Sequence, residues 1–511
     1  MRHSGTYDLL IVGGGINGVG IARDAAGRGL SVLLCEQDDL AAHTSSASTK
    51  LIHGGLRYLE HLQFSLVRKA LVEREILLAS APHLMRPLRF VLPHDKHLRP
   101  AWMIAAGLFI YDHLARRRHL PGSARIDLRR HAAGAALKPQ YTRGFVYSDG
   151  WTDDARLVVL NAVDARERGA DILTRTRCEK LEAERGHWAA TLAAPSGRHR
   201  VITRAVVNAT GPWVSSFARE ASPASVCHSV RLVKGSHIVV PRLYAHRFAY
   251  LLQNEDQRIV FAIPYQREFT LIGTTDIEYV GDPGAVHIDE KEVRYLCAAV
   301  SRYFAKPVGP EDVVWSYSGV RPLLDDEAKN PASVTRDYAL ELDRHPAPLL
   351  TVFGGKITTY RKLAESAVDM LTHELGFAAP GWTARALLPG GDLPGGAYAR
   401  FLRSLERAHP WLPAELRYRY AHAYGTRIEH ILRGARSLAD LGEELLPQLY
   451  EREADYLCRA EWAQTAEDIL WRRTRLGLHV RGGSVARLEE WLAVRSSRAP
   501  DAGRQPLTII G

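Results

Sequence analysis

The sequence predicts an α/β part with a parallel sheet, interleaved with an α+β part on an antiparallel sheet, followed by a helical C-terminal domain. Residues 8–12 (DLLIV) have the pattern of a buried strand, a glycine turn and helical periodicity follow, and residues 31–35 (SVLLC) form a second strand pattern. Such a βαβ unit implies a parallel sheet. Residues 231–280 contain three short β-rich runs separated by turns, which favours an antiparallel sheet. A linker rich in glycine and proline at 388–396 then precedes helical patterns.

The glycine turn carries the fingerprint of a Rossmann-like dinucleotide-binding domain. Gly13, Gly15 and Gly18 form G-x-G-x-x-G between the strand and the helix. Gly13 permits the tight turn, Gly15 lets the backbone approach a pyrophosphate, and Gly18 allows close packing of helix on strand. Glu36 ends the second strand, where its carboxylate is placed to accept the ribose hydroxyls and disfavours the 2′-phosphate of NADP. The turn alone leaves NAD and FAD open.

Three later segments extend this reading. AVVNATG (205–211) has the pattern of another buried strand that ends at a ligand, and residues 352–375 read as a strand, a glycine turn and a long helix. Residues 460–478 predict an amphipathic helix, because four apolar residues share one helical face: Trp462, Ala466, Ile469 and Leu470.

Composition and charge limit the class of protein. The chain has 511 residues, 24% of them charged, which is typical of a globular protein with two or three domains. The net charge of +10 favours anionic partners, but the basic residues are dispersed apart from one run at 116–119, so nucleic acid is not expected. The five cysteines lie far apart without a CxxC pair, which excludes a cysteine-pair zinc site and fits a reducing cytoplasm. We expect no metal site and no spanning helix.

The loop at 43–58 (HTSSASTKLIHGGLRY) distinguishes between NAD and FAD as the cofactor. A simple NAD domain would continue here into another βαβ repeat. This loop instead carries a row of hydroxyl side chains and then two glycines. It is suited to lie along the ribityl chain and the ring of a flavin, so the sequence favours FAD.

Six motifs then carry a family resemblance. SSASTKLIHGGLRYLEH, VNATGPW, KGSHIVVP, IGTTD, YSGVRPL and FGGKITTYRKLAE occur in this order. Together they resemble the aerobic, FAD-dependent glycerol-3-phosphate dehydrogenase family, which passes electrons to quinone, over about residues 7–480. The resemblance implies three domains: FAD-binding at 1–90, 141–230 and 320–387; substrate- and membrane-facing at 91–140 and 231–319; and helical at 388–511.

The resemblance also implies the reaction. sn-Glycerol 3-phosphate is oxidised at C2 to dihydroxyacetone phosphate, flavin N5 accepts the hydride, and a membrane quinone takes the electrons. A glycerol-3-phosphate oxidase that uses O2 stays open as an alternative, as does another FAD-dependent amine or amino-acid oxidase. No second nucleotide fingerprint follows a strand, so we expect the substrate itself to reduce the flavin.

The substrate site needs phosphate ligands and a proton acceptor. Arginine suits phosphate because its planar fork matches the phosphate oxygens. His237 is the first candidate for the base, since a neutral imidazole can take the hydroxyl proton near pH 7. Arg321 could instead orient the C2 hydroxyl and stabilise the developing alkoxide. The catalytic candidates are therefore His237 and Arg321, and the substrate-binding candidates are Arg57, Tyr58, His237, Arg321, Arg336 and Lys356.

The cofactor set combines the fingerprint, the hydroxyl-rich loop and the glycine turn before the long helix. The N-terminus of that helix and Lys356 can stabilise negative charge on the N1–C2=O side of a reduced flavin. We expect non-covalent FAD, since no Cys or His stands in an identifiable linkage motif. The cofactor-binding candidates are Gly13, Gly14, Gly15, Asn17, Gly18, Glu36, Thr44, Ser45, Ser46, Ser48, His53, Gly54, Gly55, Thr210, Gly211, Gly355, Lys356 and Thr358.

One segment suits a membrane surface. Residues 100–120 hold about eleven largely apolar residues with Trp102 and Tyr111 near the ends, followed by three arginines. The run is too short to span, and its aromatic and basic flanks favour an interfacial segment, although a buried core helix fits as well. With the family's quinone, this predicts peripheral attachment to an anionic membrane, on the cytoplasmic side of the bacterial cell membrane. A homodimer is left open.

Overall fold

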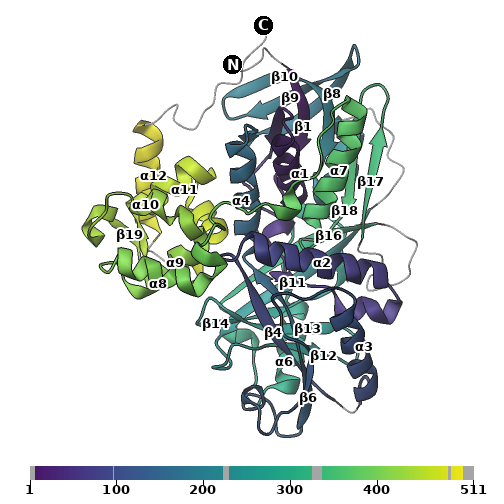
Figure 1. Ribbon diagram of the computed structural model, residues 1–511, viewed down its shortest axis with the longest axis vertical. Coiled ribbons are helices and arrows are strands. Elements are labelled where there is room, and N and C mark those ends of the chain that lie inside the picture. The colour runs from purple at the N-terminus through teal and green to yellow at the C-terminus, as the bar shows by residue number, and fades with distance from the viewer. Residues whose placement is uncertain (1–5, 96, 222–229, 325–336, 481–484, 499–511) are drawn as a thin grey trace.

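The computed structural model describes residues 6–95, 97–221, 230–324, 337–480 and 485–498. These residues form an eight-stranded sheet, a ten-stranded sheet and a helical C-terminal part. Figure 1 shows the first sheet with β1 and β10 in the upper half, the second sheet with β4 and β13 below it, and the C-terminal helices beside α4. The predicted fold class is confirmed.

The first sheet contains the predicted nucleotide-binding strands. Its order is β17-β18-β10-β1-β2-β7, and β8 and β9 extend it from β10. β1 pairs in parallel with both β2 and β10, as the βαβ unit requires. The strands are β1 (Thr6–Val12), β2 (Val32–Cys35), β7 (Asp171–Leu173), β8 (Arg177–Glu184), β9 (His187–Ala194), β10 (Gly197–Asn208), β17 (Tyr338–Asp343) and β18 (Leu349–Gly354).

Three helices cover one face of this sheet: α1 (Ile16–Gly27), α4 (Asp154–Glu167) and α7 (Tyr360–Leu375). α1 lies between the other two, and its small residues permit the close approach. A Cβ at Gly20 would come within 2.8 Å of the Tyr360 ring on α7. Leu9 and Ile11 of β1 face the same core and are fully buried.

The second sheet is almost wholly antiparallel. Its order is β15-β11-β14-β13-β12-β4-β6-β3, with β16 on β11 and β5 on β6. Among the described strands of this sheet, only β12 and β4 pair in parallel. The strands are β3 (Leu51–Ile52), β4 (Met85–Pro93), β5 (Ala124–Asp127), β6 (Arg143–Thr152), β11 (Val230–Pro241), β12 (Ala249–Gln253), β13 (Ile259–Tyr265), β14 (Phe269–Gly273), β15 (Ile277–Glu278) and β16 (Trp315–Leu324).

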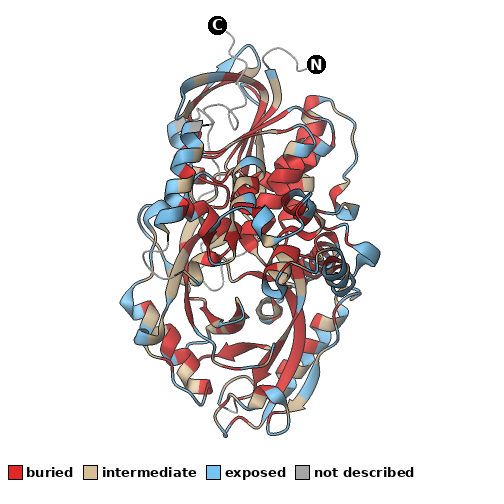
Figure 2. Ribbon diagram, turned by 90° about the vertical axis from the view of Figure 1, so that its left-hand side faces the viewer, coloured by how far each residue is buried: buried red, intermediate tan, exposed pale blue. Residues whose placement is uncertain are grey.

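Helices cover both faces of the second sheet. α2 (Phe64–Ser80) and α3 (Ala101–His113) pack on one face, and α6 (Glu290–Tyr303) packs on the other. α5 (Val214–Ala221) follows β10 in the chain. Figure 2 shows the buried residues concentrated in the sheets and on the inner sides of the helices, with the exposed residues outside.

Strands of the second sheet come from several stretches of the chain. β6 lies in the predicted segment 141–230 and β16 begins at the end of the predicted segment 231–319, and both belong to the antiparallel sheet. β6 pairs with β4 through nine residue pairs, from Met85↔Thr152 to Pro93↔Gly144. The chain therefore crosses between the sheets more often than the predicted segments suggest, and the domain boundaries themselves stay a prediction.

The C-terminal part has a hydrophobic core of its own. It comprises α8 (Tyr398–Ala408), α9 (Ala414–Tyr424), α10 (Glu429–Leu432), α11 (Glu451–Glu461), α12 (Ala486–Arg498) and a two-stranded hairpin, β19 (Glu444–Leu446) and β20 (Leu449–Tyr450). α11 and the segment after it lie against α4 of the first domain.

The single helix predicted over 460–478 is wrong. α11 ends at Glu461, and Trp462 is in the left-handed region with φ +57°, which stops a helix. The chain then forms a short π-helix, Asp468–Arg473, and a 3₁₀ turn, Leu476–Leu478. Ile469 and Leu470 are buried as predicted. The periodicity missed that Arg472 and Arg473, which follow them, are buried as well.

Candidate functional site: a cavity between the two sheets

A large cavity lies where the two sheets meet. It has a volume of about 640 Å³ and is lined by the carboxyl ends of β1, β2, β10 and β18 and by residues of β11 and β16. The carboxyl ends of parallel strands are the usual ligand-binding edge of an α/β sheet. The size suits a whole cofactor or drug-sized ligand.

The glycine turn after β1 is closed to any side chain. Gly13 has φ +114°, and a Cβ there would lie 2.5 Å from the Ala209 carbonyl oxygen. A Cβ on Gly18 would lie 1.9 Å from the Gly13 carbonyl oxygen. The turn therefore holds its backbone against β10 and leads directly into α1, whose first N–H groups point toward the cavity end of the helix.

Glu36 lines the cavity next to this turn. Its Oε2 accepts the Gly14 N–H at 2.6 Å and its Oε1 accepts the Asp38 N–H at 2.9 Å. Burial raises the pKa of Glu36, and these two backbone donors oppose the rise. Each carboxylate oxygen has a further lone pair, which is what two ribose hydroxyls require.

The hydroxyl-rich loop borders the middle of the cavity, but most of its hydroxyls have protein partners. Thr44 donates to the Val320 carbonyl at 2.7 Å, and Ser48 donates to Asp154 at 2.8 Å. Ser45 accepts the Ile16 N–H at 3.0 Å, which caps α1. The loop therefore shapes the cavity by fixing its own backbone to three different elements.

The turn after β18 closes the other end. Gly354 and Gly355 have φ of +70° and +98°, and Lys356 follows with its Nζ 3.9 Å from the centre of the Tyr58 ring. The Thr358 hydroxyl accepts the His53 N–H at 3.2 Å. Thr359 is the N-cap of α7, and its side chain makes no capping hydrogen bond.

Arg321 enters this end from β16. It forms an ion pair with Asp276 and donates to the Thr274 hydroxyl at 3.1 Å. A Cβ on Gly235 of the neighbouring strand would lie 2.4 Å from the Arg321 guanidinium, so glycine makes room for it. The side chain is held in place while about a quarter of it stays exposed.

His237 lies beside this end, outside the cavity lining and fully buried. Its Nε2 is 2.9 Å from the Thr49 hydroxyl, and its ring stacks on Tyr317 at 4.8 Å between centres. Burial, with Arg321 and Lys50 nearby, holds its pKa well below the usual range, so the imidazole is neutral at pH 7. Thr49 does line the cavity.

The structure gathers most of the predicted residues. Those that line the cavity are Gly13, Gly15, Asn17, Glu36, Thr44, Ser45, Ser48, His53, Tyr58, Thr210, Gly211, Arg321, Gly355, Lys356 and Thr358. Those outside the lining are Gly14, Gly18, Ser46, Gly54, Gly55, Arg57 and His237. Arg336 lies outside the described residues. The role of each residue stays a prediction.

Several residues of the site were missed. Thr274 and Thr49 line the cavity, and each follows or lies within a motif that was quoted, so the motifs could have named them. Asp154 and Lys50 form a buried pair at 2.8 Å behind the loop. Nothing in their spacing along the chain signals that pair.

Comparison with known proteins places this geometry in a family. The family described as "FAD dependent oxidoreductase" matches residues 8–361, and the "C-terminal domain of alpha-glycerophosphate oxidase" matches residues 382–496. The glycerol-3-phosphate dehydrogenase of Pseudomonas aeruginosa is 54% identical over 97% of this chain and 96% of its own length. The aerobic glycerol-3-phosphate dehydrogenase of Escherichia coli K12 is 51% identical over 95% and 97%.

The chain belongs to the glycerol-3-phosphate dehydrogenase family of FAD-dependent oxidoreductases.

Two further relatives bear on substrate and fold within this glycerol-3-phosphate dehydrogenase family. The D-erythritol 1-phosphate dehydrogenase of Brucella abortus is 50% identical over 96% of this chain and 98% of its own. The crystal structure of the glycerol-3-phosphate dehydrogenase from Bacillus halodurans, complexed with FAD, superposes with a TM-score of 0.77 at 28% identity, covering 98% of this chain and 92% of that one.

The cavity fits FAD, the cofactor of the family. The glycine turn and the start of α1 match a pyrophosphate, Glu36 matches the adenosine ribose, and Lys356 with the Gly354–Gly355 turn matches the flavin end. The family thus supports FAD, as the sequence predicted. Over the part of the chain that the structure describes, every helix is too short or too polar to cross a membrane.

Proposed function

We propose that this family member oxidises sn-glycerol 3-phosphate to dihydroxyacetone phosphate. The observation that carries the proposal is that two cationic side chains, Arg321 and Lys356, line one end of the cavity. More than 50% identity to relatives named for this activity supports it. Bound FAD supplies the oxidant by accepting a hydride from C2 of the substrate. The cations attract and orient the phosphate dianion.

The proton of the C2 hydroxyl needs an acceptor, and the geometry supports His237 acting through Thr49. The Thr49 hydroxyl lies between the cavity and the His237 Nε2. Burial lowers the pKa of His237, and the positive charges of Arg321 and Lys50 lower it further. A phosphate dianion bound beside Arg321 partly neutralises that positive charge and raises the pKa again. Substrate binding therefore makes the imidazole a better base, while Arg321 stabilises the developing alkoxide.

His237→Asn tests this route. The variant keeps a polar side chain but loses the base, so we expect kcat to fall by roughly 10²- to 10⁴-fold. FAD content should stay at the wild-type level, because His237 lies outside the cavity lining. A kcat within threefold of wild type, measured with the FAD-loaded protein, would exclude His237 as the acceptor.

Anaerobic reduction tests the reaction itself. Glycerol 3-phosphate added to the FAD-loaded protein without oxygen should bleach the flavin absorbance at about the rate of one catalytic turnover. Glycerol and inorganic phosphate, tested separately as controls, should leave the spectrum unchanged. A flavin that stays oxidised with glycerol 3-phosphate would remove the proposal.

D-Erythritol 1-phosphate is a second candidate substrate. It is favoured by the Brucella abortus relative, whose identity of 50% is close to that of the glycerol-3-phosphate dehydrogenases. The four-carbon substrate offers the same phosphate and an adjacent hydroxyl. The ratio of kcat/KM for the two compounds, measured on the same preparation, assigns the substrate.

A membrane quinone is the acceptor that we propose, reached by peripheral attachment through α3. Trp102 and Phe109 lie seven residues apart on one face of this helix, and their side chains are 71% and 65% exposed. Ile104, Leu108 and Tyr111 of the opposite face are buried. The exposed Arg116 and Arg118 follow the helix and suit anionic lipid on the cytoplasmic side.

O2 is the rival acceptor, favoured by the match of residues 382–496 to the C-terminal domain of alpha-glycerophosphate oxidase. The two acceptors differ in their product. We expect turnover with a soluble quinone analogue to be much faster than with air, and little peroxide to be released. Peroxide formed in equal amount to the ketone product would assign the oxidase activity instead.

A further inference from the structure

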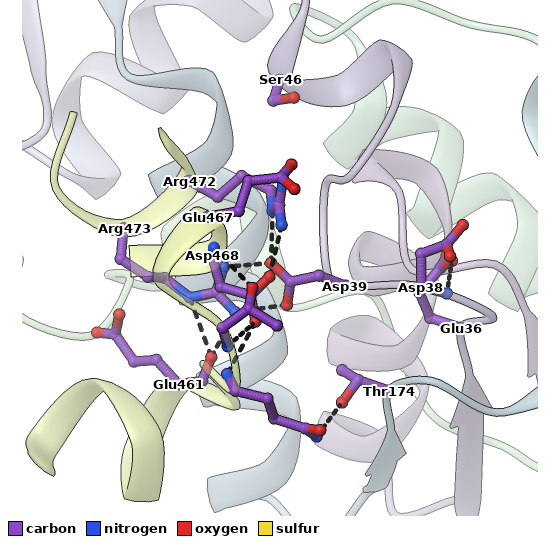
Figure 3. Close-up of polar contacts among 12 residues, drawn as sticks. Glu36, Asp38, Asp39, Ser46, Thr174, Glu461, Glu467, Asp468, Arg472 and Arg473 are labelled. Atoms are coloured by element: carbon purple, nitrogen blue, oxygen red, sulfur yellow. Dashed lines mark hydrogen bonds and ion pairs between the residues drawn. The ribbon is translucent and has the colours of Figure 1, made fainter. Parts of the chain in front are cut away.

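A short segment of the C-terminal part reaches into the cofactor domain. Residues 468–475 contain three arginines and one carboxylate that are nearly fully buried: Arg472, Arg473, Arg475 and Asp468. Each forms an ion pair with a residue of the cofactor domain, the part built on the first sheet and its helices. Figure 3 shows the segment approaching the loop that carries Asp39, Asp38 and Glu36.

The first contact fixes the loop after β2. Asp39 stands three residues after Glu36 and is 2% exposed. Its two oxygens accept both terminal nitrogens of Arg473 at 2.7 Å each, and Oδ2 also accepts Arg472 Nε at 2.6 Å. A bidentate arginine fixes the orientation of a carboxylate as well as its position. The backbone between Asp39 and Glu36 is thereby tied to the C-terminal segment (Figure 3).

The second contact reaches the neighbouring loop. Asp468 accepts Arg175 Nη2 at 2.6 Å. The Arg175 N–H in turn donates to the Asp38 carbonyl at 2.8 Å, and the Thr176 N–H donates to the Glu36 carbonyl at 2.7 Å. Burial alone would raise the pKa of Asp468, but the Gln464 N–H and three arginines outweigh it and lower the pKa to about 2. Thr176 lines the cavity.

The third contact supports the hydroxyl-rich loop. Arg475 Nη2 donates to Asp154 Oδ1 at 2.8 Å. Asp154 also accepts Lys50 Nζ at 2.8 Å and the Ser48 hydroxyl at 2.8 Å. Ser48 lines the cavity. Asp154 is fully buried, and it forms ion pairs with two cations, Lys50 and Arg475, one from each part of the chain.

We infer that residues 468–475 are positioning residues for FAD. They lie outside the cofactor domain, and none of them lines the cavity. They fix three cavity loops at Glu36, Thr176 and Ser48. FAD affinity therefore depends on this contact between the domains. The inference rests on the FAD site and is independent of which polyol phosphate is the substrate.

The reason is the burial of charge. Without Arg473, the carboxylate of Asp39 stays buried and loses its bidentate partner, keeping Arg472 at 2.6 Å and Arg175 at 3.9 Å, which is strongly unfavourable. The loop relieves this by moving Asp39 toward water, and Glu36 moves with it because only two residues separate them. A ribose bound to a displaced carboxylate loses hydrogen bonds, so FAD dissociates more readily.

The test is FAD titration into apoprotein, followed by quenching of flavin fluorescence. Arg473→Ala and the isosteric Asp39→Asn should each raise the Kd for FAD by roughly tenfold or more, as for residues that orient the ligands of a metal. Arg473→Lys should recover only part of the loss, because a lysine makes a single-point contact. With FAD saturating, KM for glycerol 3-phosphate should stay within about twofold.

Arg156→Ala is the matched control. Arg156 forms an equally buried ion pair with Glu461 of α11 between the same two parts of the chain, but its guanidinium binds the Glu461 carboxylate and the Ala423 carbonyl rather than a loop of the cavity. This variant should lower the melting temperature and leave the Kd for FAD within about twofold. If Arg156→Ala raises the Kd as much as Arg473→Ala does, general loosening of the contact explains both and the inference fails.

Two results would overturn the inference directly. One is a folded Arg473→Ala protein, judged by circular dichroism, that binds FAD with wild-type affinity. If that variant does not fold, Asp39→Asn decides, because it keeps the side-chain volume and one acceptor oxygen. Wild-type affinity in a folded Asp39→Asn protein is the second result.

Discussion

Arg321 illustrates how a single residue combines rigidity with access. Asp276 and Thr274 hold its guanidinium from one side, and the missing side chain of Gly235 leaves space beside it. A guanidinium held in this way can meet a phosphate or an alkoxide without reorganisation. A lysine at this position would reach the same place with a single flexible charge.

Arg321→Ala should therefore lower kcat/KM by roughly 10²- to 10³-fold while FAD stays bound. Arg321→Lys should recover part of the loss. Steady-state kinetics with the visible spectrum of the purified protein measure both effects. Arg231→Ala, which removes an ion pair with exposed Glu278 on the adjacent strand, serves as the control and should keep full activity.

Gly13 gives the second prediction at this scale. A side chain there meets the Ala209 carbonyl at 2.5 Å in a backbone conformation, φ +114°, that only glycine adopts readily. Gly13→Val should yield protein without bound FAD, and its melting temperature should fall. Gly29→Ala is a useful comparison, because Gly29 also has positive φ but open space around it. Full flavin content in Gly13→Val would contradict the assignment of this turn.

Among the elements, α3 exposes an apolar face that no other described element covers. Its buried face contributes to the core of the second sheet, while Trp102, Phe109 and Ile110 project outward. A helix with this division and basic residues after its end is suited to the interface of a membrane.

The double variant Trp102→Ser/Phe109→Ser should bind vesicles of anionic phospholipid at least tenfold more weakly, because burying each ring contributes about 1.5–3 kcal/mol. Sedimentation with vesicles measures the partition, and activity with a water-soluble dye should be unchanged. Val494→Ser on α12 removes an exposed apolar side chain on a different domain and should have no effect. Equal binding of all three proteins would exclude α3 as the contact.

Elements were predicted well where one physical pattern dominates. Residues 9–12 of β1 are buried on both faces and give a continuous apolar run, and the turn after them requires glycine. The prediction of one helix through the segment after Glu461 was wrong. The apolar residues of this segment have helical periodicity, but its arginines form ion pairs with Asp39 and Asp154 that a single helix does not explain. Those partners are more than 300 residues away, and no local pattern encodes them.

The same distinction holds for the site. The glycines, Glu36 and Lys356 stand in local motifs with a physical requirement, so the sequence could name them. His237 also stands in a motif, but the motif does not show that the ring lies behind Thr49 rather than in the cavity. Such placement depends on the packing of β11 against the hydroxyl-rich loop.

At the scale of the whole molecule, buried histidines make the fold sensitive to acid. Burial, with a neighbouring histidine, lowers the pKa of His83 to about 3. Burial, with Arg86 nearby, lowers that of His422 to about 4, and burial also lowers that of His246 to about 4. In the unfolded chain these groups bind protons near pH 6.5, so the unfolded state binds more protons between pH 6.5 and about 4.

The free energy of unfolding should therefore be constant for these groups above pH 6.5 and fall as the pH drops from 6.5 toward 4. Each histidine contributes up to about 1.4 kcal/mol per pH unit. Urea unfolding at pH 7.5, 6.5, 5.5 and 4.5 measures the slope. His422→Gln removes one titrating group and should make the slope shallower. A stability that does not change between pH 6.5 and 4.5 would contradict the prediction.

The ion pairs between Asp39 and Arg473 also set an order of events during synthesis. Arg473 leaves the ribosome 434 residues after Asp39, which is roughly 20–90 s later at ordinary rates of translation. Throughout that interval the loop beside Glu36 carries a carboxylate whose two closest cations, Arg472 and Arg473, have not yet been made. The nucleotide-binding half of the molecule is made first and completed last, so we expect tight binding of the flavin by the finished chain rather than by a nascent one.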